Sequence, residues 1–271
     1  LSFSQAYVVR VANVVETQTR PLTSAANTFV AVSDDNWNID AGGGNDVIQT
    51  LGGADTIRGG AGNDVILSGA GDDTITFRGN SDGYDSIDGG LGNDRIVALA
   101  NNPVIGLTSI ANVETISANG FTGVSVAGTT NADSLDFSAA TFIGITGIDA
   151  GRGNDTVIGS AGADTIRGNR GNDVISAGGG NDVITVSGTR DGYDSINGGA
   201  GNDTILALST NTAIGLTGIS GVEAISANGF SGVYVRGSSA ADTLNFTGVT
   251  LTGITRIDGG SGADTITGSA G

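Results

Sequence analysis

The sequence lacks several side chains on which functional sites commonly depend. Its 271 residues include no Cys, His or Met, and all 11 basic residues are Arg, so Lys is missing as well. Without Cys there are no disulfides and no thiolate ligands. The absence of both His and Cys also argues against a zinc or copper site.

These absences also bear on catalysis. Gly79-Asn80-Ser81-Asp82-Gly83 matches the GxSxG pattern that carries a serine nucleophile in some hydrolases. Such a serine needs a neighbouring base, and neither His nor Lys is present to act as one. A second copy of this stretch reads Gly188-Thr189-Arg190-Asp191-Gly192, in which the Ser is lost. We therefore expect no enzymatic activity from this chain.

Positive charge and aromatic residues are also scarce. Aromatic residues make up 5% of the sequence, and the net charge is −17. A strongly acidic chain is repelled by nucleic acid and by anionic membrane surfaces, and no apolar run reaches the length of a membrane span. We expect neither nucleic-acid binding nor membrane insertion, and the charge favours metal cations as partners.

Glycine, in contrast, is abundant, with 48 residues, and much of it lies in a short repeat. Residues 41–76 read AGGGNDVIQ, TLGGADTIR, GGAGNDVIL and SGAGDDTIT, four units of nine residues. We number the positions of each unit as slots 1 to 9; Gly fills slot 4, Asp slot 6 and Ile slot 8. A fixed short period indicates a stacked solenoid.

Two such units form one coil of the expected solenoid. The slot-8 residue points inward and its neighbours point outward, as in any strand, while Gly at slot 4 allows the positive φ angles of a tight turn. Parallel coils stack about 4.8 Å apart, so the slot-6 carboxylates of alternate units lie above one another and repel. A hard divalent cation between them removes the repulsion, and Ca²⁺ suits carboxylate and carbonyl oxygens best.

The predicted calcium ligands follow from this arrangement. The slot-6 residues are Asp46, Asp55, Asp64, Asp73, Asp85, Asp94, Asp155, Asp164, Asp173, Asp182, Asp194, Asp203 and Asp264. Two turns are longer than the others, and there Asp82 and Asp191 are alternatives to Asp85 and Asp194. Backbone carbonyls are expected near Gly42, Gly44, Gly60, Gly62, Gly151, Gly153, Asn169 and Gly171. Two blocks with four pairs each hold about eight ions, whose charge nearly offsets that of the chain.

Two of the units, Gly59–Leu67 and Gly89–Val97, match the pattern GGxGxDxUx at every position, where U is a large aliphatic residue. The sequence therefore resembles the RTX (repeats-in-toxin) family of calcium-binding nonapeptide repeats. The resemblance implies a parallel β-roll with calcium between alternate turns, bound by slot-6 Asp and turn carbonyls, and type I secretion from a Gram-negative bacterium. Residues 221–235 also resemble segments of RTX-type surface-layer and large surface proteins.

A second, longer repeat divides the chain. Asp155 lies 109 residues after Asp46, and Tyr193 lies 109 residues after Tyr84. We expect an all-β fold, a right-handed parallel β-solenoid in which calcium β-roll blocks alternate with metal-free β-helix coils. Its predicted parts are a cap or docking strands at 1–40, with apolar runs at 7–15 and 28–32, calcium blocks at 41–97 and 150–206, metal-free coils at 98–149 and 207–258, and the start of a third block at 259–271.

Two functions are compatible with this organisation. The first is an extracellular structural or assembly protein, such as a segment of a surface layer, a fibre or an adhesin stalk, which folds and stiffens on binding calcium. The second is the secretion and folding module of an RTX enzyme or toxin whose catalytic domain lies outside this chain. Both place the chain outside the cell or on the bacterial surface, and outward slot-7 residues or the coil ends would contact further copies of the chain.

Overall fold

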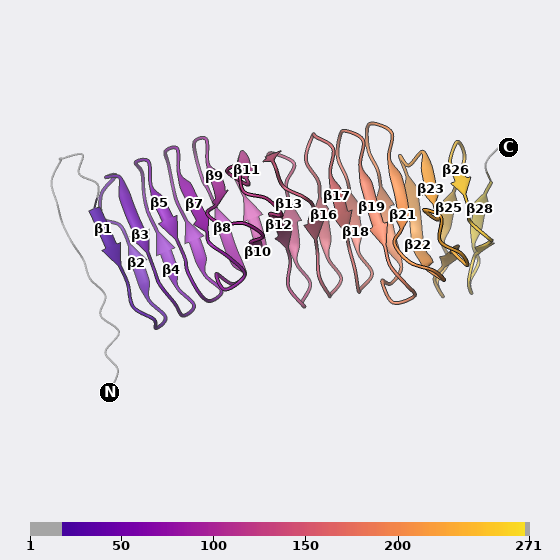
Figure 1. Ribbon diagram of the computed structural model, residues 1–271, viewed down its shortest axis with the longest axis horizontal. Helices are drawn as coiled ribbons and strands as arrows, with labels where there is room; N and C mark the ends of the chain where they lie inside the picture. The colour runs from indigo at the N-terminus through magenta and orange to yellow at the C-terminus, as the bar shows by residue number, and fades with distance from the viewer. Residues whose placement is uncertain (1–17, 269–271) are drawn as a thin grey trace. The chain divides into compact units, whose positions relative to one another are not determined.

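The computed structural model describes residues 18–268, and these form strands joined by turns, with no helix among them (Figure 1). The strands fall into two compact units. Unit 1 holds residues 18–127 and 139–146, and unit 2 holds residues 128–138 and 147–268. The apolar run predicted as a strand at residues 7–15 lies outside the described residues.

Unit 1 consists of two sheets of parallel strands, and the chain alternates between them from one strand to the next. One sheet contains β1 (Gln18–Pro21), β3 (Trp37–Asp40), β5 (Thr56–Arg58), β7 (Thr74–Phe77), β9 (Arg95–Ala98), β11 (Thr115–Ser117) and β14 (Thr141–Ile143). The other contains β2 (Thr28–Val30), β4 (Val47–Gln49), β6 (Val65–Leu67), β8 (Asp85–Asp88), β10 (Val104–Ala111) and β12 (Ser125–Ala127).

Unit 2 repeats this design. Its first row of parallel strands contains β13 (Ser134–Asp136), β16 (Thr156–Ile158), β18 (Val174–Ser176), β20 (Asp194–Asn197), β22 (Ala213–Ser220), β25 (Thr243–Asn245) and β28 (Thr265–Thr267). β22 also pairs with β24 (Tyr234–Gly237), and β24 with β27 (Ile257–Asp258). The second row contains β15 (Ile148–Asp149), β17 (Thr165–Arg167), β19 (Val183–Val186), β21 (Thr204–Ala207), β23 (Ala224–Ser226) and β26 (Thr250–Thr252).

The prediction of an all-β fold built as a parallel solenoid is confirmed. Consecutive coils are in register with the repeat, since Val47 pairs with Val65 and Thr56 with Thr74. The longer turn adds three residues without breaking this register, so that Val65 pairs with Ser86. Residues 18–40 belong to the same solenoid, because β2 and β3 pair with β4 and β5 of the first repeats, and β1 pairs with β3.

The core is a column of aliphatic side chains from slot 8. Ile48, Ile57, Ile66 and Ile75 are fully buried. On either side of Ile66, Val65 and Leu67 are each 37% exposed, as the alternation of side chains along a strand requires. Each slot-8 side chain contributes about 1.5–3 kcal/mol when fully buried, and longer strands such as β7 bury a second side chain, Phe77. Residues 18–268 include no helix long and apolar enough to cross a membrane.

This core makes a testable prediction for β6. Ile66→Ala should lower the free energy of unfolding by about 2–5 kcal/mol, because it leaves a cavity in the column. Val65→Ala, one residue away on the outer face, should cost less than about 1 kcal/mol. Urea unfolding in calcium measures both, and equal shifts of the two midpoints would contradict the inward assignment of slot 8.

Candidate calcium sites

The turns between strands are built on glycines that admit the neighbouring coil. Gly60 and Gly62, at slots 2 and 4, have φ angles of +97° and +134°. A Cβ atom on Gly60 would collide with the carbonyl oxygen of Gly42, and one on Gly62 with that of Gly44. Gly60 and Gly62 thus suit these positions for two reasons, the left-handed backbone and the carbonyl that lies directly against each of them.

The slot-6 aspartates form hydrogen-bonded ladders along the stack of coils. The backbone N–H of Asp46 donates to Oδ1 of Asp64 at 2.7 Å, and that of Asp64 donates to Oδ1 of Asp85 at 2.9 Å. All three residues are 1% exposed. Five ladders run in this way, Asn27–Asp46–Asp64–Asp85 and Trp37–Asp55–Asp73–Asp94–Glu114 in unit 1, and Asp133–Asp155–Asp173–Asp194, Asp164–Asp182–Asp203–Glu223 and Asp242–Asp264 in unit 2.

The second oxygen of most of these carboxylates has no partner. Oδ2 is buried without a hydrogen bond in Asp46, Asp55, Asp64, Asp73, Asp94, Asp155, Asp173, Asp182 and Asp203. It points into its own turn, since a Cβ atom on Gly59 would meet Oδ2 of Asp64 and one on Gly168 would meet Oδ2 of Asp173. A buried carboxylate oxygen without a partner is unfavourable, so the ladders hold negative charge that the protein itself does not compensate.

Some turn carbonyls are equally unpaired. Within residues 18–268, no hydrogen bond is formed to the carbonyl oxygens of the predicted slot-4 glycines Gly44, Gly62, Gly153 and Gly171. The same holds for Gly60 and Asn169. The carbonyls of Gly42 and Gly151, in contrast, accept the N–H groups of Ala61 and Arg170 from the following coil. Slot 4 therefore offers a free oxygen in the same turns that hold the unpaired carboxylate oxygens.

This donor set fits calcium. Carboxylate and carbonyl oxygens are the ligands of Ca²⁺, which takes six to eight of them in a flexible geometry. The described residues contain no group of three or more His, Cys, Asp or Glu side chains that could hold a metal ion by themselves. Backbone carbonyls would therefore have to complete each site alongside a pair of Asp residues.

Burial shifts the ionisation of the ladder carboxylates toward neutral pH. Desolvation raises the pKa of Asp85 to about 8, partly offset by the N–H of Asp64 and reinforced by the charge of Asp64. The same causes raise the pKa of Asp194 to about 8. Desolvation also raises the pKa of Asp155 to about 7 and that of Asp55, Asp64, Asp94 and Asp182 to about 6. Protons and a metal ion would compete for these oxygens.

In the longer turns the structure separates the two alternatives. Asp85 and Asp194 continue the ladders. Asp82 instead forms an ion pair with Arg58 at 2.8 Å and accepts the N–H of Arg78. Asp191 accepts the N–H of Ser187 at 2.6 Å. Asp82 and Asp191 thus lie outside the ladders, although both are buried.

Two further predicted ligands differ from the others. Both oxygens of Asp164 are used within its own turn, because Ser160 donates its N–H to Oδ2 at 2.6 Å and its hydroxyl to Oδ1 at 3.2 Å. Ser160 occupies slot 2, where most turns carry Gly. Asp264 joins a ladder through Asp242 at 3.1 Å, but it is only half-buried.

Four acidic residues of the ladders were not among the predicted ligands. Glu114 and Glu223 accept the N–H groups of Asp94 and Asp203 at 2.7 Å, and Asp133 and Asp242 lie in ladders of unit 2. Asp133 was recognisable from the repeat-like turn at 128–136, whereas the two Glu residues have no nonapeptide around them. The ladders thus reach into segments 98–149 and 207–258, for which metal-free coils were predicted.

Replacing one ladder carboxylate tests the sites. In the variant Asp64→Asn, the amide oxygen can still accept the N–H of Asp46. The substitution removes a buried charge that is shared by two consecutive pairs, Asp46/Asp64 and Asp64/Asp85. We expect the variant to be more stable than the parent without calcium and to bind calcium about tenfold or more weakly. Calorimetric titration and urea unfolding measure these effects.

Asp72→Asn is the matched control, because Asp72 is exposed beside the ladder and its Oδ1 accepts the N–H of Asn93. Equal calcium affinity and equal stability of the two variants would contradict the assignment of Asp64.

The raised pKa values predict an unusual pH dependence for the calcium-free chain. Because the folded pKa of these Asp residues lies above the ordinary value of 3.8, the folded state binds more protons than the unfolded state between about pH 4 and pH 8. Stability then falls as pH rises through this window. Thermal melts of dialysed protein should show a melting temperature that decreases as the pH rises from 4, until the calcium-free chain no longer folds at neutral pH.

In excess calcium the decrease should vanish or reverse, since deprotonation frees the oxygens for the metal. A calcium-free melting temperature that stays constant or rises with pH would contradict the buried ionisation of the ladders.

Comparison with known proteins gives one match. The profile described as RTX calcium-binding nonapeptide repeat (4 copies) matches residues 40–75, 81–105, 149–184, 189–211 and 250–271. Comparison with the curated proteins and with the solved structures gives no match. The matched segments make up more than half of the chain and contain most of the ladder aspartates. The predicted resemblance is confirmed, and the chain belongs to the family of RTX calcium-binding nonapeptide repeats.

Proposed function

We propose that the chain is a structural segment of an extracellular assembly, such as a surface layer, a fibre or an adhesin stalk, that folds and stiffens when calcium binds. The observation that carries the proposal is the repetition of the Asp ladders. Asp46–Asp64–Asp85 in unit 1 recurs 109 residues later as Asp155–Asp173–Asp194 in unit 2, with the same hydrogen bonds. A repeated ladder serves a repeated structure, whereas a catalytic site is a single cluster of unlike groups.

The residues proposed to hold calcium are the consecutive Asp pairs of each block and the slot-4 carbonyls beside them. In unit 1 the pairs are Asp46/Asp64, Asp64/Asp85, Asp55/Asp73 and Asp73/Asp94, and in unit 2 they are Asp155/Asp173, Asp173/Asp194, Asp164/Asp182 and Asp182/Asp203. These pairs support the expectation of about eight ions. The turn of Asp164 is the weakest candidate, because Ser160 already satisfies its oxygens.

The ladders couple folding to calcium through their electrostatics. At neutral pH the folded chain must bury ionised carboxylates one above another, each with an oxygen that lacks a hydrogen bond, and this opposes folding. A bound Ca²⁺ supplies the missing charge and the missing oxygen contacts. Folding is then driven by mass action at the millimolar calcium levels at which extracellular modules work. At low calcium the chain would stay unfolded, as export through a narrow channel requires.

A calcium titration of the dialysed chain tests the proposal. Circular dichroism should show β structure appearing as calcium rises into the millimolar range, and negative-stain microscopy of the same samples should show filaments or sheets. Magnesium is the control ion, because it demands six ligands in a tight octahedron and loses its water reluctantly. It should give little folding at the same concentration.

The outcomes separate the two parts of the proposal. A β signal and a melting temperature unaffected by calcium would contradict calcium-coupled folding. Calcium-dependent folding into particles that remain monomeric at every concentration would contradict the assembly role and favour a secretion and folding module.

A further inference from the structure

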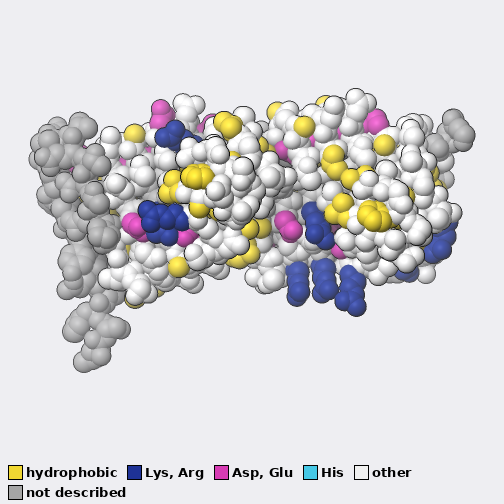
Figure 2. Space-filling view, viewed as in Figure 1, with side chains coloured by type: hydrophobic (Ala, Val, Ile, Leu, Met, Phe, Trp, Pro, Cys, Tyr) yellow, Lys and Arg dark blue, Asp and Glu magenta, His cyan; other side chains and the backbone are white. Residues whose placement is uncertain are grey.

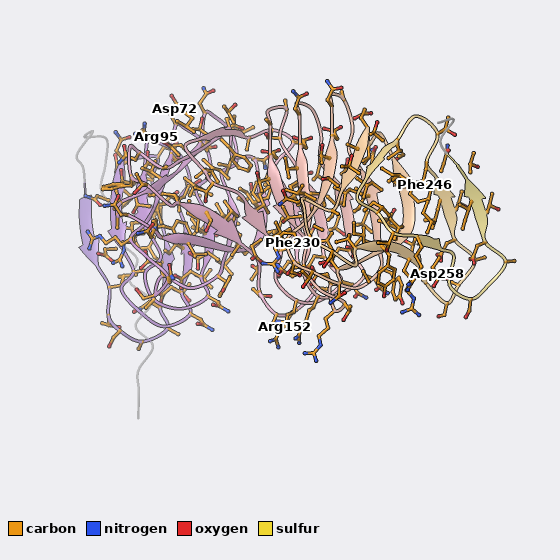
Figure 3. The ribbon with its side chains drawn as sticks, turned by 45° about the vertical axis from the view of Figure 1, so that its right-hand side comes forward. Asp72, Arg95, Arg152, Phe230, Phe246 and Asp258 are labelled. Atoms are coloured by element: carbon orange, nitrogen blue, oxygen red, sulfur yellow. The ribbon has the colours of Figure 1, made fainter. Side chains whose placement is uncertain are left out.

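Unit 2 carries a group of arginines that the calcium ladders do not use. Arg152 and Arg170 occupy slot 3 of consecutive coils and are paired directly by a backbone bridge. Arg190 lies in the longer turn that follows. All three side chains are exposed. Dark blue side chains stand side by side along this edge in Figure 2, and Arg152 projects outward from its turn in Figure 3.

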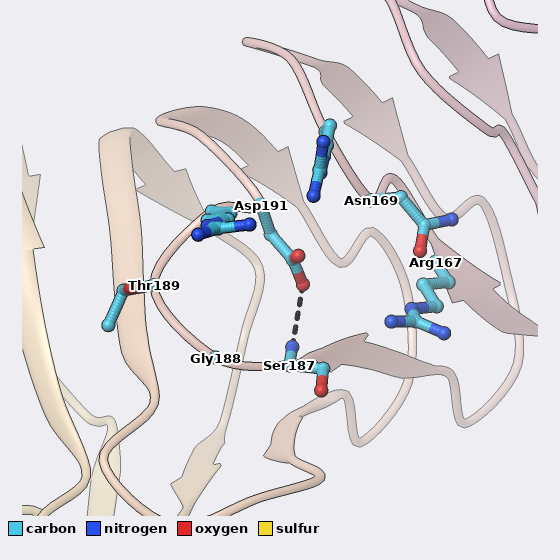
Figure 4. A pocket seen from close by; sticks show the side chains of 8 residues that line it. Arg167, Asn169, Ser187, Gly188, Thr189 and Asp191 are labelled. Atoms are coloured by element: carbon cyan, nitrogen blue, oxygen red, sulfur yellow. Dashed lines mark hydrogen bonds between the residues drawn. The ribbon is translucent and has the colours of Figure 1, made fainter.

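A pocket of about 370 Å³ lies beside this row and is lined by Arg167, Asn169, Arg170, Ser187, Gly188, Thr189, Arg190 and Asp191 (Figure 4). Its lining contains three Arg residues against one Asp. The pocket is therefore positively charged in a chain whose net charge is −17.

The corresponding position of unit 1 lacks these charges. The residues 109 positions earlier are neutral, namely Gly43 for Arg152, Ala61 for Arg170 and Ser81 for Arg190. Because the coils of both units have the same register at this position, the arginines are not needed to build the turn. They are an addition to one copy of the repeat.

The remaining arginine also differs between the two units. In unit 1, Arg58 forms ion pairs with Asp40 at 3.1 Å and with Asp82 at 2.8 Å, so its guanidinium is already neutralised by carboxylates of the same unit. Arg167 is its equivalent in unit 2, and within the described residues it forms no ion pair; in both arginines the buried Nε has no hydrogen-bond partner. The carboxylate of Asp191 accepts the N–H of Ser187 instead. Unit 2 therefore keeps guanidinium groups available where unit 1 has neutralised one.

We propose that this pocket and the adjoining arginine row bind an acidic sugar, a carbohydrate that carries carboxylate groups, as a unit of a longer chain. Guanidinium groups bind a carboxylate through two parallel hydrogen bonds. The hydroxyls of Ser187 and Thr189 suit sugar hydroxyls, as does Oδ1 of Asn169, whose Nδ2 already donates to Asp149. The carboxylate of Asp191 accepts hydrogen bonds from hydroxyls but repels a bare anion. This mixture of groups favours an acidic sugar over an inorganic anion.

The row of arginines argues for a polymer. The paired backbones of Arg152 and Arg170 lie about 4.8 Å apart, a spacing similar to the length of one sugar unit in an extended polysaccharide, and Arg190 follows in the next coil. Several weak contacts along one chain then add to a higher affinity than a single unit can reach. The inference needs only the folded, calcium-loaded chain and does not rest on the proposed assembly role.

Calorimetric titration of the calcium-loaded chain tests this with four probes. Tetragalacturonate should bind at least about tenfold more tightly than galacturonate, galactose should not bind measurably, and sulfate should bind more weakly than galacturonate. Free calcium is held constant throughout. Equal binding of galactose and galacturonate, or sulfate binding as tightly as galacturonate, would overturn the proposal. If tetragalacturonate bound no more tightly than galacturonate, the polymer would be excluded.

Variants locate the site. Arg170→Ala combined with Arg190→Ser gives unit 2 the residues that unit 1 carries, and it should weaken tetragalacturonate binding by about tenfold or more. Arg170→Lys keeps the charge but loses the planar fork, so it should weaken binding to a smaller extent. Arg95→Thr is the matched control, because it likewise replaces an exposed Arg by its counterpart in the other copy, Thr204.

The control should bind as the parent does. Unchanged affinity in the double variant and in Arg170→Lys would exclude the arginine row. Calcium-dependent circular dichroism of each variant confirms that its solenoid is folded.

Discussion

The structure depends on carboxylates that are stacked and buried with half of their hydrogen-bonding capacity unused. One oxygen of Asp64 binds the N–H of Asp46, while the other points into a glycine turn without a partner. Glycine suits these turns because a carbonyl of the preceding coil lies where a Cβ atom would be. The glycines and the aspartates therefore act together. The glycines let the backbones of neighbouring coils approach each other, which brings turn carbonyls close to the carboxylates, and the aspartates supply the negative charge.

The two copies of the repeat show which features this constraint fixes and which it leaves free. The ladders recur with the same partners in both units, and slot 8 is buried in both. Outward slot-3 positions do not contribute to the ladder, and there Ala61 is exchanged for Arg170. The neighbouring Arg58 and Arg167 are retained, but only Arg58 forms ion pairs. Conservation of the scaffold with exchange of its outer residues is how one fold acquires different surfaces.

The sequence predicted the parallel solenoid and the ladder members with the standard nonapeptide, because period and side-chain alternation together determine which residues are buried. It left Asp82 and Asp85 as alternatives, since three extra residues make the slot count ambiguous; in the structure Asp85 continues the ladder, while Asp82 lies outside it and binds Arg58. It placed Asp164 with the other ligands, although Ser160 satisfies that carboxylate locally. Glu114 was missed because its place in the ladder is set by a 20-residue coil and not by a nonapeptide around it.

The ends of the ladders follow from the same electrostatics. One ladder of each unit ends inside the core, on Asp85 or Asp194, and desolvation raises the pKa of both residues to about 8, so that protonation can remove this terminal charge. In each unit one ladder ends on a glutamate, Glu114 or Glu223, which accepts the last N–H and is only half-buried. A glutamate can therefore be the last acceptor of a ladder without a glycine turn around it. The coils at this end contain the strands β10 and β22, whose buried residues are mainly aliphatic.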